Sequence, residues 1–180
     1  MKIKIAATLI SVIFAVALCG AKDKSSKVKP PRVDLFVAAI QGNLKAVEQH
    51  IAAGSDLNIR EPEVGSTPLI TAALFGKTEI ARALIEAGAE LDVKNNDGST
   101  ALMTAAVFCR TEIVQLLLEN GADKTLTNNA GATPLIAVSV PFENVKPIYE
   151  QLEKALSPLG LQLDYQRLEA TRPKIAEMLQ

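Results

Sequence analysis

The apolar residues of this chain recur in short stripes at the spacing of α-helices, and polar turns separate the stripes. The clearest stripes are Ile80, Ala83, Leu84 and Ile85, followed further on by Ile113, Val114, Leu116, Leu117 and Leu118. Apolar residues at this spacing predict helices with one buried face. A shorter and more evenly apolar segment precedes each stripe. The pattern therefore predicts pairs of helices that end in polar turns such as Asn96-Asp97-Gly98.

Near-identical phrases also recur at a fixed step of 33 residues, beginning at positions 67, 100 and 133. The first reads TPLITAA, the second TALMTAA and the third, weaker one TPLIAV, and an earlier echo, LFVAA, begins at Leu35. A period near 33 is typical of a solenoid, in which each unit buries its apolar face only against its neighbours. We therefore expect an all-α stack of about four units.

Each unit carries its own start and stop signals. Thr67, Thr100 and Thr133 are suited to cap the first helix, because a threonine hydroxyl accepts a hydrogen bond from an amide that the helix leaves unpaired. Proline follows the first and third of them, at a position where no amide donor is needed. Gly42 and Gly76 suit the left-handed conformation that closes the first helix. Further glycines, Gly54, Gly88 and Gly121, close the second helix.

These residues resemble the ankyrin repeat, most clearly in TPLITAALFGKTEIARALIEAGAELDVKNNDGS (67–99) and TALMTAAVFCRTEIVQLLLENGADKTLTNNAGA (100–132). The resemblance implies a curved ankyrin-repeat solenoid with hairpin fingers along one edge and a protein-binding, non-enzymatic role. We place its units at 33–66, 67–99, 100–132 and 133–163. Residues 164–180 are expected to form a C-terminal capping helix that starts at Pro173, with Thr171 as its cap and Ile175, Met178 and Leu179 inward.

Three departures from the family pattern alter these expectations. The histidine that often follows Thr-Pro-Leu in the family is replaced by Ile70, Met103 and Ile136, which makes the interior more apolar. Cys109 stands where Gly76 stands one unit earlier, and a side chain makes a positive φ costly, so we expect that helix end to be remodelled. One extra residue lies around 61–64, so that finger should differ in shape.

The resemblance places the partner-binding residues on finger tips and on the inner face of the first helices. The matching finger residues are Arg60, Glu61, Glu63, Val64, Lys94, Asn96, Asp97, Ser99, Thr127, Asn129 and Ala130. The inner-face residues are Ile40, Gln41, Leu74, Phe75, Val107, Phe108, Val140 and Pro141. Leu74-Phe75 and Val107-Phe108 are expected to form an exposed apolar stripe that anchors a partner. The alternative is that these side chains fold back between repeats or under the fingers.

Residues 1–21 have the pattern of a secretory signal peptide. Lys2 and Lys4 precede an uncharged apolar run, and Cys19-Gly20-Ala21 offers small residues for cleavage after Ala21. Two alternatives stay open, a lipid on Cys19 or an uncut membrane anchor, and only through these would the chain meet a membrane. Residues 22–32 follow as a basic, flexible linker whose positive charge mildly opposes translocation. We expect a bacterial periplasmic or secreted protein.

Charge divides unevenly between the two ends of the chain. The whole sequence has 19 basic and 20 acidic residues. Seven basic residues and one acidic residue lie in residues 1–32, which leaves 12 and 19 in residues 33–180, a net charge of −7. An acidic body repels nucleic-acid phosphates, so we expect no nucleic-acid partner and, among proteins, one with a basic surface. A generic soluble surface explains the same charge.

Motifs for catalysis, metals and cofactors are absent from the sequence. It has no phosphate loop, no zinc-protease helix and no nucleophile elbow. His50 is the only histidine, and its helix position favours a partly buried structural role. Cys109 is left as the only cysteine after cleavage, which excludes a disulfide within the mature chain. Three alternatives to a soluble binding protein remain: an envelope-anchored structural protein, a redox-responsive protein that uses Cys109 and, least favoured, a hydrolytic enzyme, for which the sequence offers no nucleophile with a base.

Overall fold

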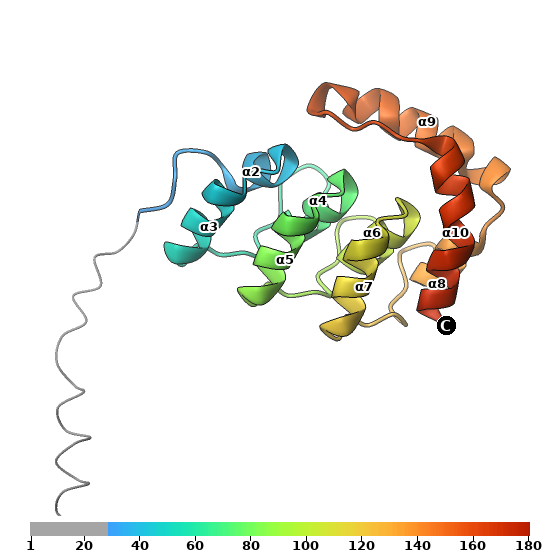
Figure 1. Ribbon diagram of the computed structural model, residues 1–180, viewed down its shortest axis with the longest axis horizontal. Coiled ribbons are helices and arrows are strands. Elements are labelled where there is room, and N and C mark those ends of the chain that lie inside the picture. Colours follow the sequence, from blue (N-terminus) through green and yellow to red (C-terminus); the bar gives the residue numbers. More distant parts are fainter. Residues whose placement is uncertain (1–28) are drawn as a thin grey trace, which may run out of the picture.

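The computed structural model describes residues 29–180, which form a stack of helix pairs (Figure 1). The predicted signal peptide (1–21) and most of the predicted basic linker (22–32) lie outside the described residues. The first three pairs are α2 (Leu35–Gln41) with α3 (Leu44–Ala52), α4 (Pro68–Phe75) with α5 (Thr78–Glu86), and α6 (Ala101–Val107) with α7 (Thr111–Glu119). Helices α2, α4 and α6 form one layer, and α3, α5 and α7 form the other. No strand occurs in residues 29–180, and the predicted all-α repeat stack is confirmed.

The core of the stack lies between neighbouring helix pairs. Ala72, Ala73, Ala105 and Ala106 are fully buried, which lets α4 and α6 approach closely. Larger side chains fill the space between the two layers, among them Leu69, Leu84, Leu102, Ile113 and Leu117. Each of these is at most 1% exposed and contributes on the order of 1.5–3 kcal/mol by its burial.

The predicted helix starts are confirmed at all three threonines. The hydroxyl oxygen of Thr67 accepts the N–H of Ile70 at 3.2 Å, and Thr100 and Thr133 cap α6 and α8 (Pro134–Ser139) in the same way. The helix stop at Gly76 is also as expected, with φ of 65°. The N–H of Lys77 there donates to the carbonyl of Ala72 at 2.9 Å and closes the helix.

The expected remodelling at Cys109 is wrong in its main part. Cys109 adopts a φ of 52°, the only positive φ of a non-glycine residue among those described. The N–H of Arg110 donates to the carbonyl of Ala105 at 2.8 Å, which matches the bond of Lys77 one unit earlier. Helix α6 ends one residue sooner than α4, but the closing hydrogen bond is kept. The thiol is fully buried and lies 3.5 Å from the carbonyl of Leu168, so packing offsets the backbone strain.

The first finger differs from the others as predicted. In the later fingers the side-chain oxygen of Asn95 or Asn128 accepts two backbone N–H groups across the turn. The first finger is one residue longer, and Glu61 takes the place of the asparagine. Its longer side chain accepts N–H groups from Glu63, Val64 and Ser66, and thereby spans the extra residue.

The end of the described chain departs from the repeat. After α8 come α9 (Phe142–Leu156), the short 3-10 helix η1 (Ser157–Leu159) and α10 (Tyr165–Leu179). Helix α10 packs against α7 and α8, so it takes the place beside α7 that a fourth second helix would occupy. Helix α9 instead leaves the stack and lies over the layer of α4 and α6 (Figure 1).

The prediction that a short helix starts at Pro173 is also wrong. Helix α10 begins at Tyr165, capped by Asp164, whose carboxylate accepts the N–H of Arg167 at 3.0 Å. Pro173 lies inside the helix, where its missing N–H is tolerated because the helix is held by packing along its length. Ile175 is fully buried and Leu179 is 3% exposed, as predicted, whereas Met178 is only half-buried.

His50 has the structural role that the sequence favoured. It is buried at the end of α3, and its Nε2 lies 2.8 Å from the carbonyl oxygen of Val33. A carbonyl only accepts, so Nε2 donates this bond, and Nδ1 accepts from the hydroxyl of Ser55 at 3.0 Å. His50 thereby ties the segment that enters the stack to the loop that follows α3.

Candidate partner-binding surface

The exposed apolar stripe expected on the inner face does not form, because α9 covers its second half. Phe108 is only 5% exposed. Its ring meets the ring of Tyr149 edge-on at a centroid distance of 5.8 Å, and Phe142 stacks on the same tyrosine at 5.9 Å. Phe75 is half-buried and packs against the core. Phe108 is therefore a core residue under α9 and no anchor for a partner.

A buried tyrosine and a buried arginine hold α9 in this position. The Tyr149 hydroxyl donates to the carbonyl of Val107 at 2.6 Å and accepts from Arg172 Nη1 at 2.9 Å. The other terminal nitrogen of Arg172 donates to the carbonyls of Ala137 and Val140, at 3.1 and 2.8 Å. Burial raises the pKa of Tyr149 to about 12, although Arg172 lowers it, so the hydroxyl stays protonated at neutral pH. The hydrogen bonds of Tyr149 and Arg172 thus connect α6, α8, α9 and α10.

Between α9, the fingers and the inner helices lies a pocket of about 360 Å³, which we call the roofed pocket. Its floor is formed by α4 and α6, its roof by the second half of α9, and its edge by the fingers. The apolar residues that dominate the floor and roof are Ile70, Leu74, Met103, Val107, Leu152 and Leu156. The edge contains Val64, Asn95, Asp97 and Asn128. The volume and the apolar lining with few polar groups are typical of ligand pockets.

The roofed pocket collects six of the residues expected to bind a partner and leaves the others outside. Those that line it are Val64, Leu74, Asp97, Ser99, Val107 and Phe108. Those outside its lining are Ile40, Gln41, Arg60, Glu61, Glu63, Phe75, Lys94, Asn96, Thr127, Asn129, Ala130, Val140 and Pro141. Val140 instead lines a shallower hollow with Arg172 on the α8–α10 side.

Several of the expected finger residues connect one finger to the next. Asn96 accepts from Arg60 at 2.8 Å and donates to the carbonyl of Glu63 at 3.0 Å. Asn129 repeats the second contact, with a bond of 2.8 Å to the carbonyl of Asn96. Lys94 donates to the carbonyl of Thr127 at 2.7 Å. These side chains hold the fingers in register. The exposed finger residues without such a side-chain bond are Glu63, Val64, Asp97, Thr127 and Ala130.

Sequence reasoning missed the roof of the pocket. Leu152 and Leu156 belong to a stripe on α9 that also contains Phe142, Val145 and Tyr149, at spacings of three, four, three and four residues. This spacing is the signal of a long amphipathic helix. These residues were instead placed in a regular fourth unit (133–163). The second helix of such a unit would be shorter than α9 and would pack beside α7.

The Cys109 thiol is poorly placed for redox chemistry. It is fully buried beneath α10. Burial raises its pKa, an effect that the positive charges of Arg172, Arg167 and Arg110 only partly oppose. The thiolate is the reactive form of cysteine, so burial and a raised pKa both disfavour reaction.

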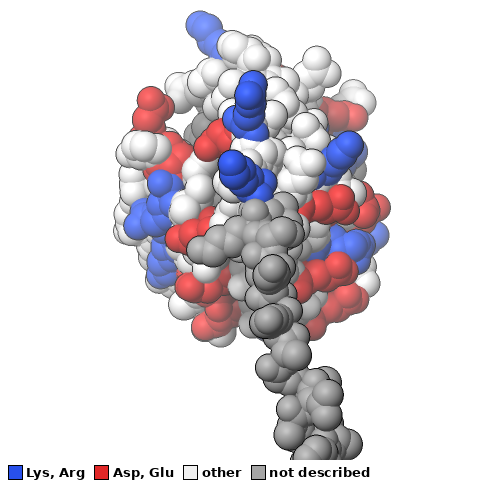
Figure 2. Space-filling view, turned by 90° about the vertical axis from the view of Figure 1, so that its left-hand side faces the viewer, with Lys and Arg blue, Asp and Glu red and all other residues white. Residues whose placement is uncertain are grey.

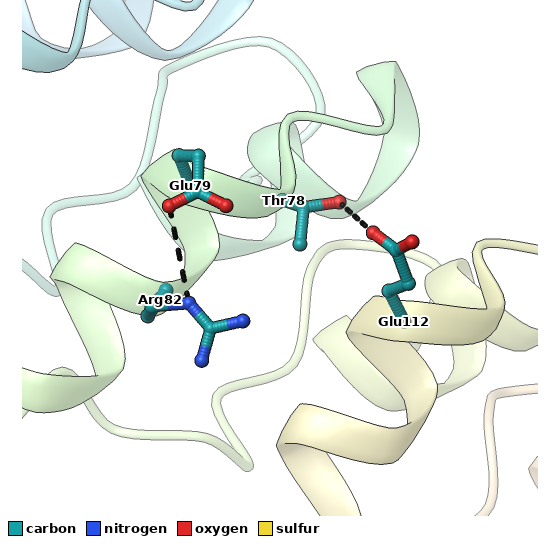
Figure 3. A network of polar contacts seen from close by, with 4 residues as sticks. All are labelled: Thr78, Glu79, Arg82 and Glu112. Atoms are coloured by element: carbon teal, nitrogen blue, oxygen red, sulfur yellow. Dashed lines mark hydrogen bonds and ion pairs between the residues drawn. The ribbon is translucent and has the colours of Figure 1, made fainter.

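The polar contacts of α5 and α7, in the outer layer of helices, lie on the protein surface. Thr78 on α5 donates to Glu112 on α7 at 3.3 Å, and Glu79 lies 3.9 Å from Arg82 (Figure 3). The side chains of Arg82 and Glu79 are 46% and 70% exposed, so the ion pair is largely screened. Within residues 29–180, no group of three side chains is arranged to hold a metal ion. No helix in that range is long and apolar enough to cross a membrane.

Charges of both signs are interspersed on the end of the stack that is formed by its first helix pair. Figure 2 shows basic and acidic side chains side by side on the described residues of this face. Mixed charge of this kind is ordinary for a soluble surface and marks no single-sign binding patch there.

Comparison with known proteins agrees with the geometry. The family model for ankyrin repeats, in three copies, matches residues 35–128. Human protein phosphatase 1 regulatory subunit 27 is 42% identical over 64 residues, which cover 36% of this chain and 41% of that protein. Dauer abnormal formation protein 25 of Caenorhabditis elegans is 35% identical over 85 residues, or 47% of this chain and 22% of that protein. The human DNA-binding protein RFXANK is 42% identical over 52 residues, or 29% and 20%.

The chain thus spans less than half the length of these curated relatives. The family match ends at residue 128, before α8, α9 and α10 begin. It nevertheless extends over more than half of the 180 residues and coincides with the three regular helix pairs. The chain therefore belongs to the ankyrin repeat family.

Proposed function

We propose that this chain is an exported, non-enzymatic protein-binding module that holds its partner at the edge formed by the fingers, α4, α6 and α9. The observation that carries the proposal is the roofed pocket, which lies directly beside the exposed finger residues Val64 and Asp97. Ankyrin repeats bind other proteins, and one relative is by its name a regulatory subunit. Both facts favour recognition over catalysis.

The proposed partner presents a basic surface. Residues 33–180 carry a net charge of −7, and the exposed carboxylates Glu63 and Asp97 lie on neighbouring fingers. Opposite charges across an interface speed association and help to select the partner. The polar bonds between fingers fix the spacing of these carboxylates, so that the surface is pre-organised before binding.

The proposed export rests on the sequence of residues 1–21 alone. Two lysines, an uncharged apolar run and small residues before the expected cleavage point are the features of a signal peptide. Mass spectrometry of the mature amino terminus tests this directly. A chain that begins at Lys22 supports export, a lipid on Cys19 points to an envelope anchor, and an intact Met1 in a cytoplasmic fraction contradicts the proposal.

The binding role is tested by capture from the cells that make the protein. The finger variant Glu63→Lys/Val64→Asp changes two exposed residues at the proposed edge. The matched control Glu48→Lys/Glu86→Lys changes two exposed residues on the outer layer. We expect the finger variant to lose a protein that the wild type and the control both retain. Equal capture by all three proteins would contradict the proposed surface.

A further inference from the structure

We propose that the roofed pocket takes a bulky apolar side chain of the partner, with a neighbouring lysine or arginine of the partner placed against Asp97. This inference deepens the proposed function and rests on it, because the pocket lies within the proposed binding edge. It goes beyond the properties of the repeat itself, because α9 lies outside the family match at residues 35–128. The roof is therefore formed by residues outside the matched repeats.

The floor and roof determine the apolar part of the occupant. Leu74, Val107, Leu152 and Leu156 are half-buried and leave part of their apolar surface facing the pocket. Met103 lies at the floor, and a methionine side chain adapts its shape to what packs against it. An apolar side chain inserted here would remove both its own surface and theirs from water. Such enclosed anchors carry most of the binding energy at protein interfaces.

The fingers at the edge of the roofed pocket determine the charged part of the occupant. Asp97 is the only described residue lining the pocket that has a charged side chain. It is exposed, and only its backbone groups take part in the described hydrogen bonds, with Asn95 and Asn129. The side-chain oxygens of Asn95 and Asn128 are already occupied by backbone N–H groups of their own fingers. The unpaired carboxylate at the mouth therefore favours a cation and disfavours an anion.

Three capped peptides of equal length test both parts on the folded protein. Gly-Leu-Arg-Gly carries the apolar group and the cation, Gly-Leu-Glu-Gly reverses the charge, and Gly-Ser-Arg-Gly lacks the apolar group. NMR titration measures each Kd and shows which residues respond. We expect the first peptide to shift signals of Leu74 and Met103 and to bind about three- to fivefold more tightly than the second, as a surface ion pair allows. The third peptide should leave these signals unchanged.

Matched variants locate the binding. Ala155→Phe fills the pocket from an exposed position on α9, whereas Ile148→Phe places the same ring on α9 outside the pocket lining. Binding should be lost in the first and kept in the second. Asp97→Asn should abolish the preference for arginine over glutamate, while Glu86→Gln, at an exposed position on the outer layer, should leave it unchanged. Circular dichroism of each variant checks that the helices are intact.

The outcomes that overturn this inference are distinct from those that overturn the proposed function. Equal Kd values for the arginine and glutamate peptides, binding that survives Ala155→Phe, or no shift at millimolar peptide each contradict the pocket proposal. If isopentylammonium alone binds as tightly as the first peptide, the occupant is a small amine and the commitment to a partner side chain fails. A partner lost from the finger variant but kept by Ala155→Phe leaves the proposed function standing without the pocket.

Discussion

Replacing Tyr149 by phenylalanine should loosen α9 by removing one oxygen atom. The Tyr149 hydroxyl donates to the carbonyl of Val107 and accepts from the buried guanidinium of Arg172. The ring and its contacts with Phe108 and Phe142 are retained in Tyr149→Phe. Any loss of stability therefore reports on the two hydrogen bonds.

The expected loss of stability follows from the hydrogen-bonding groups that Tyr149→Phe leaves without a partner. A hydrogen bond to a charged group contributes about 1.5–3 kcal/mol, and a buried polar group without a partner costs about 1–3 kcal/mol. Arg172 keeps its two bonds to the carbonyls of Ala137 and Val140, which limits the cost on that side. We expect the free energy of unfolding to fall by about 2–4 kcal/mol.

Urea denaturation followed by circular dichroism measures this loss, and hydrogen exchange of the α9 amides shows whether the helix itself opens. Tyr165→Phe is the matched control, because its hydroxyl bonds Glu153 on the surface and solvent replaces that bond. A loss no larger than that of the control would refute the reasoning, since α9 would then be held by apolar packing alone.

The raised pKa of the Tyr149 hydroxyl predicts that the stability of the protein falls at alkaline pH. The pKa of Tyr149 is raised by burial to about 12 in the folded protein, against 10.0 in the unfolded chain. The folded state therefore holds the proton more tightly, and this contribution to stability is full below pH 10 and is lost as the pH rises toward 12. In a Tyr165→Phe background, which removes the other high-pKa tyrosine, Tyr149→Phe should flatten the fall in urea midpoint over this range.

Three further predictions concern the fingers and the thiol. Asn96→Ala removes two bonds between fingers and should cost about 1 kcal/mol, with faster amide exchange at Gly65; an unchanged urea midpoint would contradict it. Burial raises the pKa of Glu61, but the backbone N–H groups that it accepts lower the pKa overall, so its contribution is present above the unfolded value of 4.5 and lost as the pH falls below it. Glu61→Gln should thus weaken the acid dependence of the urea midpoint, and an identical dependence in both proteins would refute the assigned bonds. Cys109 should resist thiol labelling until denaturant unfolds the chain, as mass spectrometry of the labelled peptide would show, whereas rapid native labelling would contradict its burial.

The sequence predicted those parts of the fold that local chemistry determines. Thr67 and Gly76 act on amides and carbonyls within a few residues of themselves, so their roles follow from their positions in the repeat. Glu61 also acts locally, and the single extra residue beside it was enough to show that this finger differs.

The roof of the pocket could not be predicted in this way, because its position depends on contacts between residues that are far apart in the sequence. Phe108 and Phe75 occupy equivalent positions in neighbouring units, yet Phe108 is buried against Tyr149 of α9 whereas Phe75 is half-buried. The repeat pattern carries no information about a helix that lies outside it. The predicted helix start at Pro173 was wrong for a related reason. The tendency of proline to break a helix is weaker than the packing that holds α10 along its length.

The position of Arg172 in the chain affects how the protein is made. The three regular helix pairs are complete once residue 119 has been synthesised, and solenoid units of this kind can fold as they emerge. The guanidinium that donates to Tyr149 lies 53 residues beyond residue 119, so α9 is synthesised before Arg172 and at first has only its contacts with α6 to hold it. The three regular helix pairs can therefore be folded before the roof of the pocket has all of its hydrogen bonds.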